Sequence, residues 1–301
     1  MSEIGVEIGR DDLPVVVGPT ASGKSELALR LAERLDGEII GADSVQIYRR
    51  FDVGSGKPND AQRARVVHHL VDSFDPLEPV DAMTYARLAR ETIEQVRRRG
   101  KIAIVCGGTF LWVRALVYGL APAPSGDPEI RARHAAQAYQ QGRRSLHERL
   151  LEVDPTAAAR LAPNDFVRVS RALEVWEMTG RPLSCWQHEH GFKVPMYRAK
   201  LLGIRRSPAE LAALIARRTD RFLRAGWVDE VCELVRAGYR EARAMSSVGY
   251  RQVLAHVDGR LASSELGSAI DRATRIFARR QRTWLRDQPV KWLGPPQREI
   301  I

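Results

Sequence analysis

The sequence has few cysteines and no long apolar run, and each shortage excludes a class of protein. Its three cysteines lie far apart in a chain of 301 residues, with no CxxC pair, so neither a disulfide framework nor a zinc knuckle is indicated. No segment approaches the roughly 18 uninterrupted apolar residues of a membrane helix. The first residues lack the basic and apolar parts of a secretory signal. We therefore expect a cytoplasmic protein with reduced thiols and no membrane contact.

Lysine is also scarce: most of the 47 basic residues are arginines, and together the basic residues give the chain a net charge of +10. Residues 1–121 carry 16 basic and 17 acidic side chains, residues 122–196 carry 10 and 9, and residues 197–301 carry 21 and 11. Such a one-sided excess is typical of proteins that bind nucleic acid, although a solvated arginine-rich surface would give the same count. The 44% of hydrophobic residues indicates a globular chain with a core.

The strongest concentration of charge is a segment near the C-terminus that contains six arginines and no acid. Five of them are spaced by three or four residues, as one face of an α-helix requires: Arg272, Arg275, Arg279, Arg282 and Arg286. The apolar residues expected on the opposite face are Ile270, Ala273, Phe277 and Trp284. A solvated helix would interleave glutamates between the arginines. A nucleic-acid backbone would supply the missing anions.

Apolar runs alternate with helical periods in the first part of the chain. Short buried strands are predicted over residues 13–17, 38–40 and 101–106. Helices are predicted between them, over 25–35 and 85–99, and the second of these ends at a glycine. The alternation predicts an α/β fold with an open parallel sheet.

Residues 18–25 read Gly-Pro-Thr-Ala-Ser-Gly-Lys-Ser and match the pattern G-x-x-x-x-G-K-[ST] between a predicted strand and a predicted helix. In that context backbone N–H groups and the helix N-terminus face an anion, Lys24 adds a positive charge and Ser25 is able to bind Mg²⁺. The pattern predicts a site for a di- or triphosphate. Its predicted ligands are Gly18, Thr20, Ala21, Ser22, Gly23, Lys24 and Ser25, with Ser25 also the metal ligand.

A proline-rich break over residues 122–128 interrupts the alternation. Beyond it only helical periodicity occurs until a second break, after which an apolar strand returns at 200–204. We therefore predict a P-loop NTPase-like parallel sheet core from residues 1–121 and 197–301, whose C-terminal part is helical and basic. Residues 122–196 would form a helical insertion domain.

A phosphate site does not by itself make an enzyme, because hydrolysis or phosphoryl transfer usually needs an acid at the end of a second strand. The strand predicted over 101–106 is followed by Gly107, Gly108 and Thr109, with no carboxylate. Asp43, which follows the strand at 38–40, is the available acid. It would cap a helix, hold a metal or act as a general base, and the pattern alone does not choose among these roles.

These motifs occur in the order seen in the tRNA dimethylallyltransferases, the IPP transferase family, which this chain resembles over nearly its whole length. The matching segments are 18–25, 42–48, 54–58, 68–72, 107–109, 163–165 with Arg168, 171–175, 248–251, 273–275 and 279–284. So many ordered matches are specific, whereas the phosphate-binding loop alone would not be.

The resemblance implies a transferase that moves a dimethylallyl group from dimethylallyl diphosphate to the N6 amine of adenine, with Mg²⁺ as cofactor. An exocyclic amine is a poor nucleophile, so it needs a base and a carbon that is already losing its leaving group. Asp43 matches the family's base, and Thr109 matches a threonine near the reacting centre. A diphosphate-binding arginine is expected among Arg217, Arg218 and Arg221, and its spacing from the following glycine favours Arg218.

The implied acceptor is the tRNA anticodon stem-loop, in which the adenine beside the anticodon must leave its stack to be modified. By resemblance the RNA contacts are Asp43, Ser44, Val45, Gln46, Thr109, Arg131, Val167, Arg168, Val169, Ser170, Arg171, Ser246, Gly249, Tyr250 and Arg251. The insertion domain would lie over the anticodon loop. From the arginine stripe we add stem-phosphate contacts at Arg275, Arg279 and Arg282. Nothing in the sequence indicates an obligate interface, so a monomer is expected.

Three other functions compete with this one. A related class of enzymes prenylates free adenine nucleotides, but it would need neither a helical insertion nor a basic C-terminal third. A P-loop kinase of small molecules is disfavoured by the missing acid after residues 101–106. A non-catalytic RNA-binding module would not need an intact phosphate loop beside an acid, and replacement of Asp43 would separate it from an enzyme.

Overall fold

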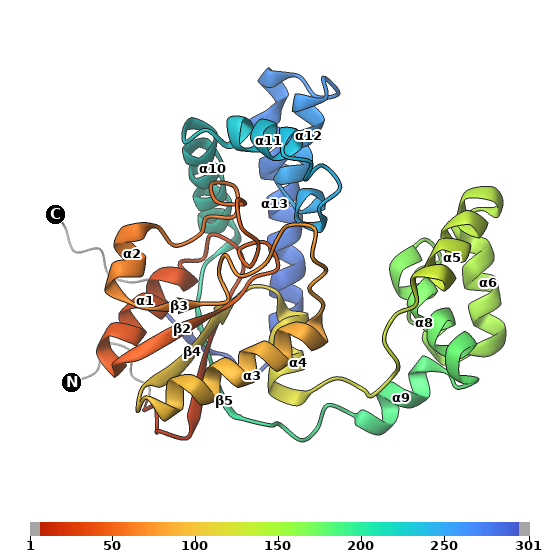
Figure 1. Cartoon of the computed structure of the whole chain (residues 1–301), viewed down its shortest axis with the longest axis horizontal. Coiled ribbons are helices and arrows are strands. Elements are labelled where there is room, and N and C mark those ends of the chain that lie inside the picture. Colours follow the sequence, from red (N-terminus) through yellow and green to blue (C-terminus); the bar gives the residue numbers. More distant parts are fainter. Residues whose placement is uncertain (1–6, 295–301) are drawn as a thin grey trace. The chain divides into compact units, whose positions relative to one another are not determined.

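The computed structural model describes residues 7–294, which belong to two compact units (Figure 1). The second unit comprises Tyr118–Val194, and the segments before and after it together form the core unit. Residues 1–6 and 295–301, the ends of the predicted core, lie outside the described residues. None of the helices in the described range has the length and apolar character needed to cross a membrane.

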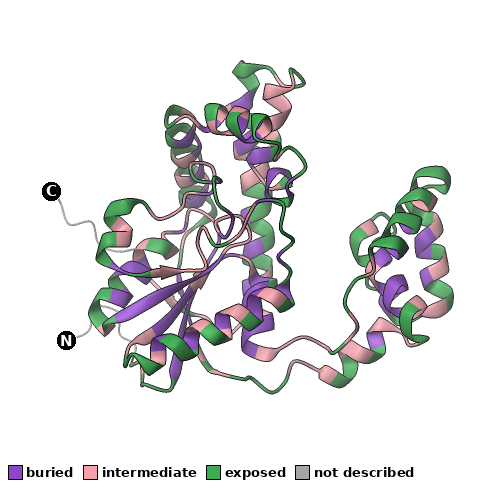
Figure 2. Cartoon of the chain, viewed as in Figure 1, coloured by how far each residue is buried: buried purple, intermediate pink, exposed green. Residues whose placement is uncertain are grey.

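The core unit is built on one parallel sheet. Its strands are β1 Asp12–Val17, β2 Gly37–Ala42, β3 His68–His69, β4 Ile102–Gly107, β5 Arg198–Ile204 and β6 Lys291–Leu293. They follow the order β3-β2-β4-β1-β5-β6, and Val15 of β1 pairs with Val105 on one side and Leu201 on the other. Every residue of β1 and β2 is buried (Figure 2), as expected for parallel strands covered by helices. The predicted α/β class is confirmed.

Helices follow most of these strands. Those of the core unit are α1 Lys24–Leu35, α2 Asp60–Arg65, α3 Ala82–Arg98, α4 Phe110–Tyr118, α10 Pro208–Arg224, α11 Trp227–Arg236, the 3-10 turn η1 Arg243–Ser246, α12 Tyr250–Val257 and α13 Ser263–Leu285. α1 and α3 pack against β2 and β4. On α1, Leu27 and Leu31 lie four residues apart on one face and join Val16 and Ile104 of the sheet in an apolar cluster.

The carboxyl ends of three strands bring three sequence motifs to one edge of the sheet. β1 leads into the phosphate-binding loop, β2 ends before residues 43–46, and β4 ends before Gly108 and Thr109. These strands are neighbours in the order β2-β4-β1, so the segments that follow them converge. This edge is where open parallel sheets bind ligands.

The helices of the C-terminal third pack on one another beside this edge. α10 begins at a capping box in which the Ser207 hydroxyl accepts the Glu210 N–H at 3.2 Å. Its apolar residues Leu211 and Ile215 pack against Ala278 of α13. α11 packs against both α10 and α12. The packing leaves α13 with one covered face and one exposed face.

The exposed face of α13 carries four of the five arginines of the predicted stripe, with Arg286 at its C-cap, but its covered face differs from the expected one. Ile270 is buried as expected, whereas Phe277 is 37% exposed and the polar Gln281 is buried. Gln281 is satisfied there because its amide accepts the Thr20 N–H at 2.8 Å and donates to the Gly108 carbonyl at 3.0 Å. A hydropathy pattern cannot detect a polar residue whose partners belong to distant segments.

The second unit contains helices only, within the described residues. They are α5 Pro128–Gln141, α6 Arg143–Val153, α7 Pro155–Ala158, α8 Phe166–Thr179 and α9 Leu183–His190. Three of them begin at an aspartate whose side chain accepts a backbone N–H: Asp127, Asp154 and Asp165. The unit has its own apolar cluster, which includes Leu146, Leu150, Val169, Ala172 and Leu173.

Candidate functional site

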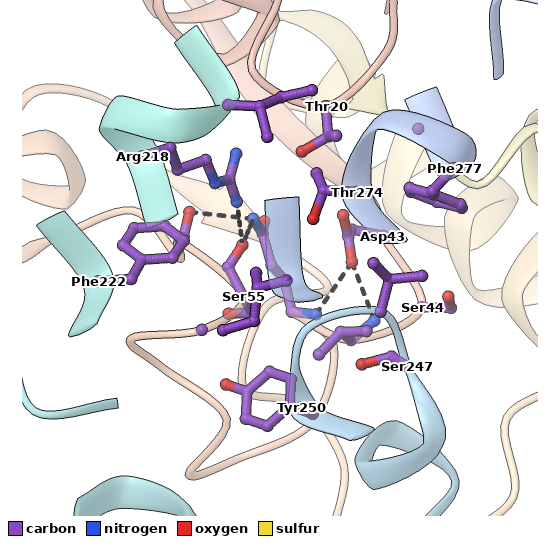
Figure 3. Close-up of a pocket in the computed structure, with 18 of the residues that line it drawn as sticks. Thr20, Asp43, Ser44, Ser55, Arg218, Phe222, Ser247, Tyr250, Thr274 and Phe277 are labelled. Atoms are coloured by element: carbon purple, nitrogen blue, oxygen red, sulfur yellow. Dashed lines mark hydrogen bonds between the residues drawn. The ribbon is translucent and has the colours of Figure 1, made fainter. Parts of the chain in front are cut away.

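A cavity of about 400 Å³ lies at the carboxyl edge of the sheet, within the core unit (Figure 3). Its walls come from the phosphate-binding loop, residues 43–46, residues 54–56, residues 108–109 and the helices of the C-terminal third. The residues predicted from the sequence that line it are Thr20, Lys24, Ser25, Asp43, Ser44, Val45, Gln46, Thr109, Arg218, Ser246, Tyr250 and Arg251. The fold therefore brings distant segments of the chain into one pocket.

The phosphate-binding loop turns into α1 at the cavity. Gly23 precedes the helix with φ +98°, a left-handed conformation that glycine adopts without steric cost. The N-terminus of α1, with its free N–H groups, is thereby directed at the space where an anion would bind. The loop residues that line the cavity are Thr20, Lys24 and Ser25. The other predicted ligands shape the loop behind this lining: Gly18, Ala21, Ser22 and Gly23.

Of the four cations that line the cavity, the two that are half-buried, Lys24 and Arg218, carry the argument for an anion site. Neither Lys24 nor Arg218 forms an ion pair with a carboxylate within residues 7–294. Burial lowers the pKa of the Lys24 ammonium and also lowers the pKa of the Arg218 guanidinium. Arg218 donates to the Ser55 carbonyl at 3.0 Å and lies over the Phe222 ring, 4.7 Å from its centroid. The Asp43 carboxylate acts on both cations from a distance and raises both pKa values, but burial outweighs it and no direct ion pair forms. A partly buried charge that is only partly compensated is costly, so the site favours an anionic ligand.

The three candidate arginines of α10 occupy different environments. Arg218 is half-buried and lines the cavity, whereas Arg217 and Arg221 are exposed and do not line it. Successive residues of a helix point in different directions, so only part of such a cluster is able to face one site. The position favoured by spacing is the one that the fold directs into the pocket.

Asp43 follows the last residue of β2 and uses one carboxylate oxygen locally. Its Oδ1 accepts the N–H groups of Val45 at 2.9 Å and Gln46 at 3.2 Å. These bonds close a turn over residues 44–47, where no helix follows, so the helix cap that the pattern allowed is wrong, although the aspartate does bind backbone N–H groups. Its Oδ2 has no hydrogen-bond partner among the described residues, and the side chain lines the cavity (Figure 3). The two roles coexist, because Oδ1 orients the carboxylate while Oδ2 is available to a ligand.

Thr109 is tied to the same segment. Its N–H donates to the Ala42 carbonyl at 3.2 Å, and its Oγ1 accepts the Ser44 N–H at 3.0 Å and donates to the Ser44 hydroxyl at 3.3 Å. These bonds connect the end of β4 to the end of β2. Both predicted catalytic residues, Asp43 and Thr109, therefore line one cavity.

The sequence does not single out some of the residues that complete the wall. Gly54, Ser55 and Gly56 line the cavity, and the carbonyls of Ser55 and Gly56 each accept the Gln46 amide at 3.1 Å. A Cβ on Gly54 would lie 1.9 Å from the indole nitrogen of Trp227, so a glycine is required there. These three residues belong to the segment 54–58 that matches the family. Their role in the wall depends on Trp227 of α11, which lies far later in the chain.

Aromatic rings form the apolar part of the wall. Trp227 stands edge-to-face with both Phe222 and Tyr250, at centroid distances of 5.8 and 5.5 Å. Gly249 has φ +94°, and a Cβ there would lie 2.3 Å from the Trp227 ring. Gly249, predicted as an RNA contact, is thus placed behind the cavity, where it admits the indole.

The predicted stem-phosphate contacts lie outside the cavity. Arg275, Arg279 and Arg282 are exposed, and none of them forms an ion pair with any residue that the structure describes. Two neighbours on α13, Phe277 and Arg280, line the cavity instead. Arg280 was missed because it lies off the regular stripe.

In the second unit some of the predicted RNA contacts are buried and others are exposed. Arg131 and Arg171 bind the fully buried carboxylate of Glu174, at 2.8 and 2.5 Å. Val169 and Ser170 are 0% and 3% exposed, so their side chains are not available to RNA, which corrects the prediction. Five consecutive residues of a helix cannot all face one ligand. Those of the predicted run that stand exposed are Val167 and Arg168.

Protein ligands for a metal are sparse. No group of three His, Cys, Asp or Glu side chains that could hold a metal occurs among residues 7–294. Ser25, at the start of α1, and Asp43 are oxygen donors that line the cavity. Mg²⁺ commonly takes one or two protein ligands and completes its octahedron with phosphate oxygens and water. The donor set therefore fits a Mg²⁺ ion that is bound together with a diphosphate.

The fold and the cavity define an α/β protein whose phosphate-binding loop opens beside a free carboxylate. Comparison with protein families identifies it further: the model for IPP transferases matches residues 46–288, and the model for isopentenyl transferases matches residues 11–73. The chain belongs to the IPP transferase family.

Relatives match along most of the chain. The tRNA dimethylallyltransferase of Sorangium cellulosum is 60% identical to this chain over 95% of this chain and 91% of the relative. The tRNA dimethylallyltransferase of Geobacter metallireducens is 47% identical over 94% of this chain and 93% of the relative. The crystal structure of the tRNA isopentenylpyrophosphate transferase of Bacillus halodurans has a TM-score of 0.69 at 32% identity, covering 94% of this chain and 90% of that one. The structure of a eukaryotic dimethylallyltransferase acting on tRNA, which is 24% identical, shares the fold with a TM-score of 0.79 and covers 94% of this chain and 74% of that one.

Proposed function

We propose that this protein transfers a dimethylallyl group from dimethylallyl diphosphate to N6 of the adenine that follows the anticodon in tRNA. The observation that carries the proposal is the cavity, where the unpaired cations Lys24 and Arg218 share one space with the free carboxylate oxygen of Asp43. The names of the relatives support the choice of donor and acceptor.

The donor binds with its diphosphate on the phosphate loop, against Lys24 and Arg218. Negative charge develops on the diphosphate as the C–O bond breaks, and cations already held in place stabilise that charge with little reorganisation. When bound, Mg²⁺ neutralises part of the same charge, with Ser25 as its protein ligand. The hydrocarbon group lies against the apolar side chains that Phe222 and Trp227 contribute to the cavity.

The acceptor reaction forms a bond between adenine N6 and C1 of the dimethylallyl group while the bond from C1 to the diphosphate oxygen breaks. Asp43 Oδ2 takes the proton that N6 loses, since Oδ1 is held by the N–H groups of Val45 and Gln46. The Thr109 hydroxyl turns its single proton from the Ser44 hydroxyl to the departing oxygen and donates a hydrogen bond to it. Diphosphate leaves, and the carboxylic acid of Asp43 returns its proton to water.

RNA binding is assigned to exposed basic surfaces. Arg275, Arg279 and Arg282 of α13 contact stem phosphates, and Val167 and Arg168 of α8 contact the anticodon loop. Phosphate contacts position an RNA without specifying its sequence, whereas contacts to unstacked bases specify it. One chain contains every group invoked here, which supports action as a monomer.

The test mixes purified protein with Mg²⁺, radiolabelled dimethylallyl diphosphate and unmodified tRNA, and counts label in precipitated RNA. Parallel reactions replace the RNA with AMP, or replace the donor with labelled ATP. Label in RNA alone supports the proposal. Label in AMP would assign the protein to the nucleotide-prenylating class, and phosphate transfer from ATP would make it a kinase.

The base is tested by Asp43→Asn, which keeps an oxygen for the Val45 and Gln46 N–H groups and removes the proton acceptor. Transfer is expected to fall about 100- to 10,000-fold, the usual contribution of a general base. The matched control is Asp60→Asn, at an exposed position in the first turn of α2. Equal rates for the two variants would contradict the role of Asp43.

A further inference from the structure

Glu230 of α11 collects four hydrogen bonds from two separate segments of the core unit. Its Oε2 accepts the N–H groups of Asp52 at 2.8 Å and Val53 at 2.6 Å, and its Oε1 accepts the Gly54 N–H at 3.3 Å. The Tyr250 hydroxyl also donates to Oε1, at 2.6 Å. A carboxylate has about four acceptor positions, so this one is fully used.

The backbone that Glu230 holds is the 52–56 loop, which connects the two halves of the proposed site. The carbonyl of Ser55 accepts both the Arg218 guanidinium at 3.0 Å and the Gln46 amide at 3.1 Å. Gln46 belongs to the segment that Asp43 begins, and Arg218 is the cation of α10. A shift of the loop would therefore move Arg218 relative to the phosphate loop.

Glu230 acts on the site from outside the cavity. It does not line the cavity of the proposed active site, but it lines a separate one of about 560 Å³ together with Asp52 and Val53. One turn earlier on α11, Trp227 packs so closely on Gly54 that the loop admits no side chain there. The helix thus holds the 52–56 loop twice, by packing at Trp227 and by charge-assisted hydrogen bonds at Glu230.

We propose that Glu230 is a positioning residue for the donor half of the site, which sets the place of Arg218 through the 52–56 loop without touching substrate. The identity of the donor and the acceptor rests on the proposed function. The effect of Glu230 on diphosphate binding requires only that the phosphate-binding loop binds diphosphate. Glutamine at this position would keep the volume but would direct amide hydrogens at backbone N–H donors.

The first measurement is calorimetric titration of inorganic diphosphate with Mg²⁺ into the full chain. Glu230→Gln is expected to weaken binding about tenfold, the scale of a lost charge-assisted hydrogen bond. The matched control is Glu233→Gln, an exposed glutamate one turn along the same helix, whose side chain has no partner among the described residues. Equal affinities for the two variants would overturn the inference.

Kinetics separate positioning from general destabilisation. Glu230→Gln should raise KM for dimethylallyl diphosphate about tenfold and leave KM for tRNA at the value of Glu233→Gln, with a modest fall in melting temperature from the backbone N–H groups that lose their acceptor. Parallel losses in both KM values with a lower melting temperature would indicate a merely structural role. Glu230→Asp keeps the charge and retracts it by one methylene, so it gives a second, milder variant with an intermediate donor KM.

A double-mutant cycle tests whether the effect travels through Arg218. If it does, Arg218→Ala and Glu230→Gln together should weaken diphosphate binding little more than Arg218→Ala alone. Effects that multiply would show that Glu230 acts elsewhere. If the wild-type protein transfers no label to tRNA while this non-additivity holds, the proposed function fails and the role of Glu230 stands.

Discussion

The two units of this chain each enclose charged side chains, and they compensate the enclosed charge in opposite ways. In the second unit, Arg131 and Arg171 converge on Glu174, whose side chain is 0% exposed. In the core unit, Lys24 and Arg218 line a cavity and pair with no carboxylate among the described residues. The cluster around Glu174 is complete without a ligand, whereas the cavity is not.

This difference separates structural cations from cations that bind a ligand. A charge that is paired inside its own unit contributes to folding, and its removal leaves the partner uncompensated. A charge without an internal partner is held at a cost, which an anionic ligand offsets. Removing one charge from each region should therefore change the free energy of unfolding in opposite directions.

The largest expected effect is at Glu174. Glu174→Ala leaves Arg131, Arg171 and the Asp127 N–H without the carboxylate that they share, so the second unit should lose about 2 to 3 kcal/mol of stability, less than for a fully buried pair because both guanidinium groups reach solvent. Urea unfolding followed by circular dichroism measures this, with Glu148→Ala, an exposed position on α6, as control. Diphosphate binding should be unchanged. If Glu174→Ala lost diphosphate binding as well as stability, the charges of the two regions would not be independent.

Lys24→Met tests the opposite case. Diphosphate affinity should fall about 10- to 100-fold, because a charge-assisted hydrogen bond to the ligand is lost. The melting temperature of the ligand-free protein should stay the same or rise, since an uncompensated charge is removed. Lys101→Met is the control, at a lysine paired with Asp36. A clear drop in melting temperature for Lys24→Met would contradict the comparison.

The exposed arginines of α13 form a third environment, neither paired nor enclosed. Replacing Arg275, Arg279 and Arg282 together by alanine should weaken tRNA binding and lower the slope of log affinity against log salt by about 2 to 3. The preference for one anticodon loop over another should not change. Arg224→Ala, which removes a guanidinium already paired with Asp220, should leave the slope unaltered.

The smallest effect concerns pH. Burial raises the pKa of Glu174, but hydrogen bonds from Arg171 and Arg131 outweigh it and hold the pKa below its ordinary value. A carboxyl whose pKa is lowered by folding contributes its full stability above the unfolded pKa of about 4.3 and loses it as the pH falls through the folded value. Acid titration of stability should thus be shallower below pH about 4 for Glu174→Gln than for the wild type.

Much of the core followed from local patterns. The strands predicted over 13–17, 38–40, 101–106 and 200–204 all occur, because a short apolar run between turn signals is visible in the sequence. β3 and β6 were not predicted, since two or three residues are too few to show any period. The covered face of α13 was wrong because Gln281 is buried through partners on other segments.

The candidate site shows the same division. Lys24, Asp43 and Thr109 each follow a strand, so the rule for parallel sheets places them at one edge. Trp227 and Glu230 carry no such signal, because their partners at residues 52–54 lie far earlier in the chain. The buried positions of Val169 and Ser170 depend on which face of α8 packs inward.

By itself the sequence determined the α/β class, the phosphate-binding loop and the strand-end residues that approach it. These properties are local, since a strand, its following loop and a helix cap are each encoded by neighbouring residues. Only the tertiary structure decided which cations are paired and which are free, and that Glu230 holds the loop beneath Arg218. Charge compensation depends on distances between atoms from segments far apart in the chain, and only the folded chain sets those distances.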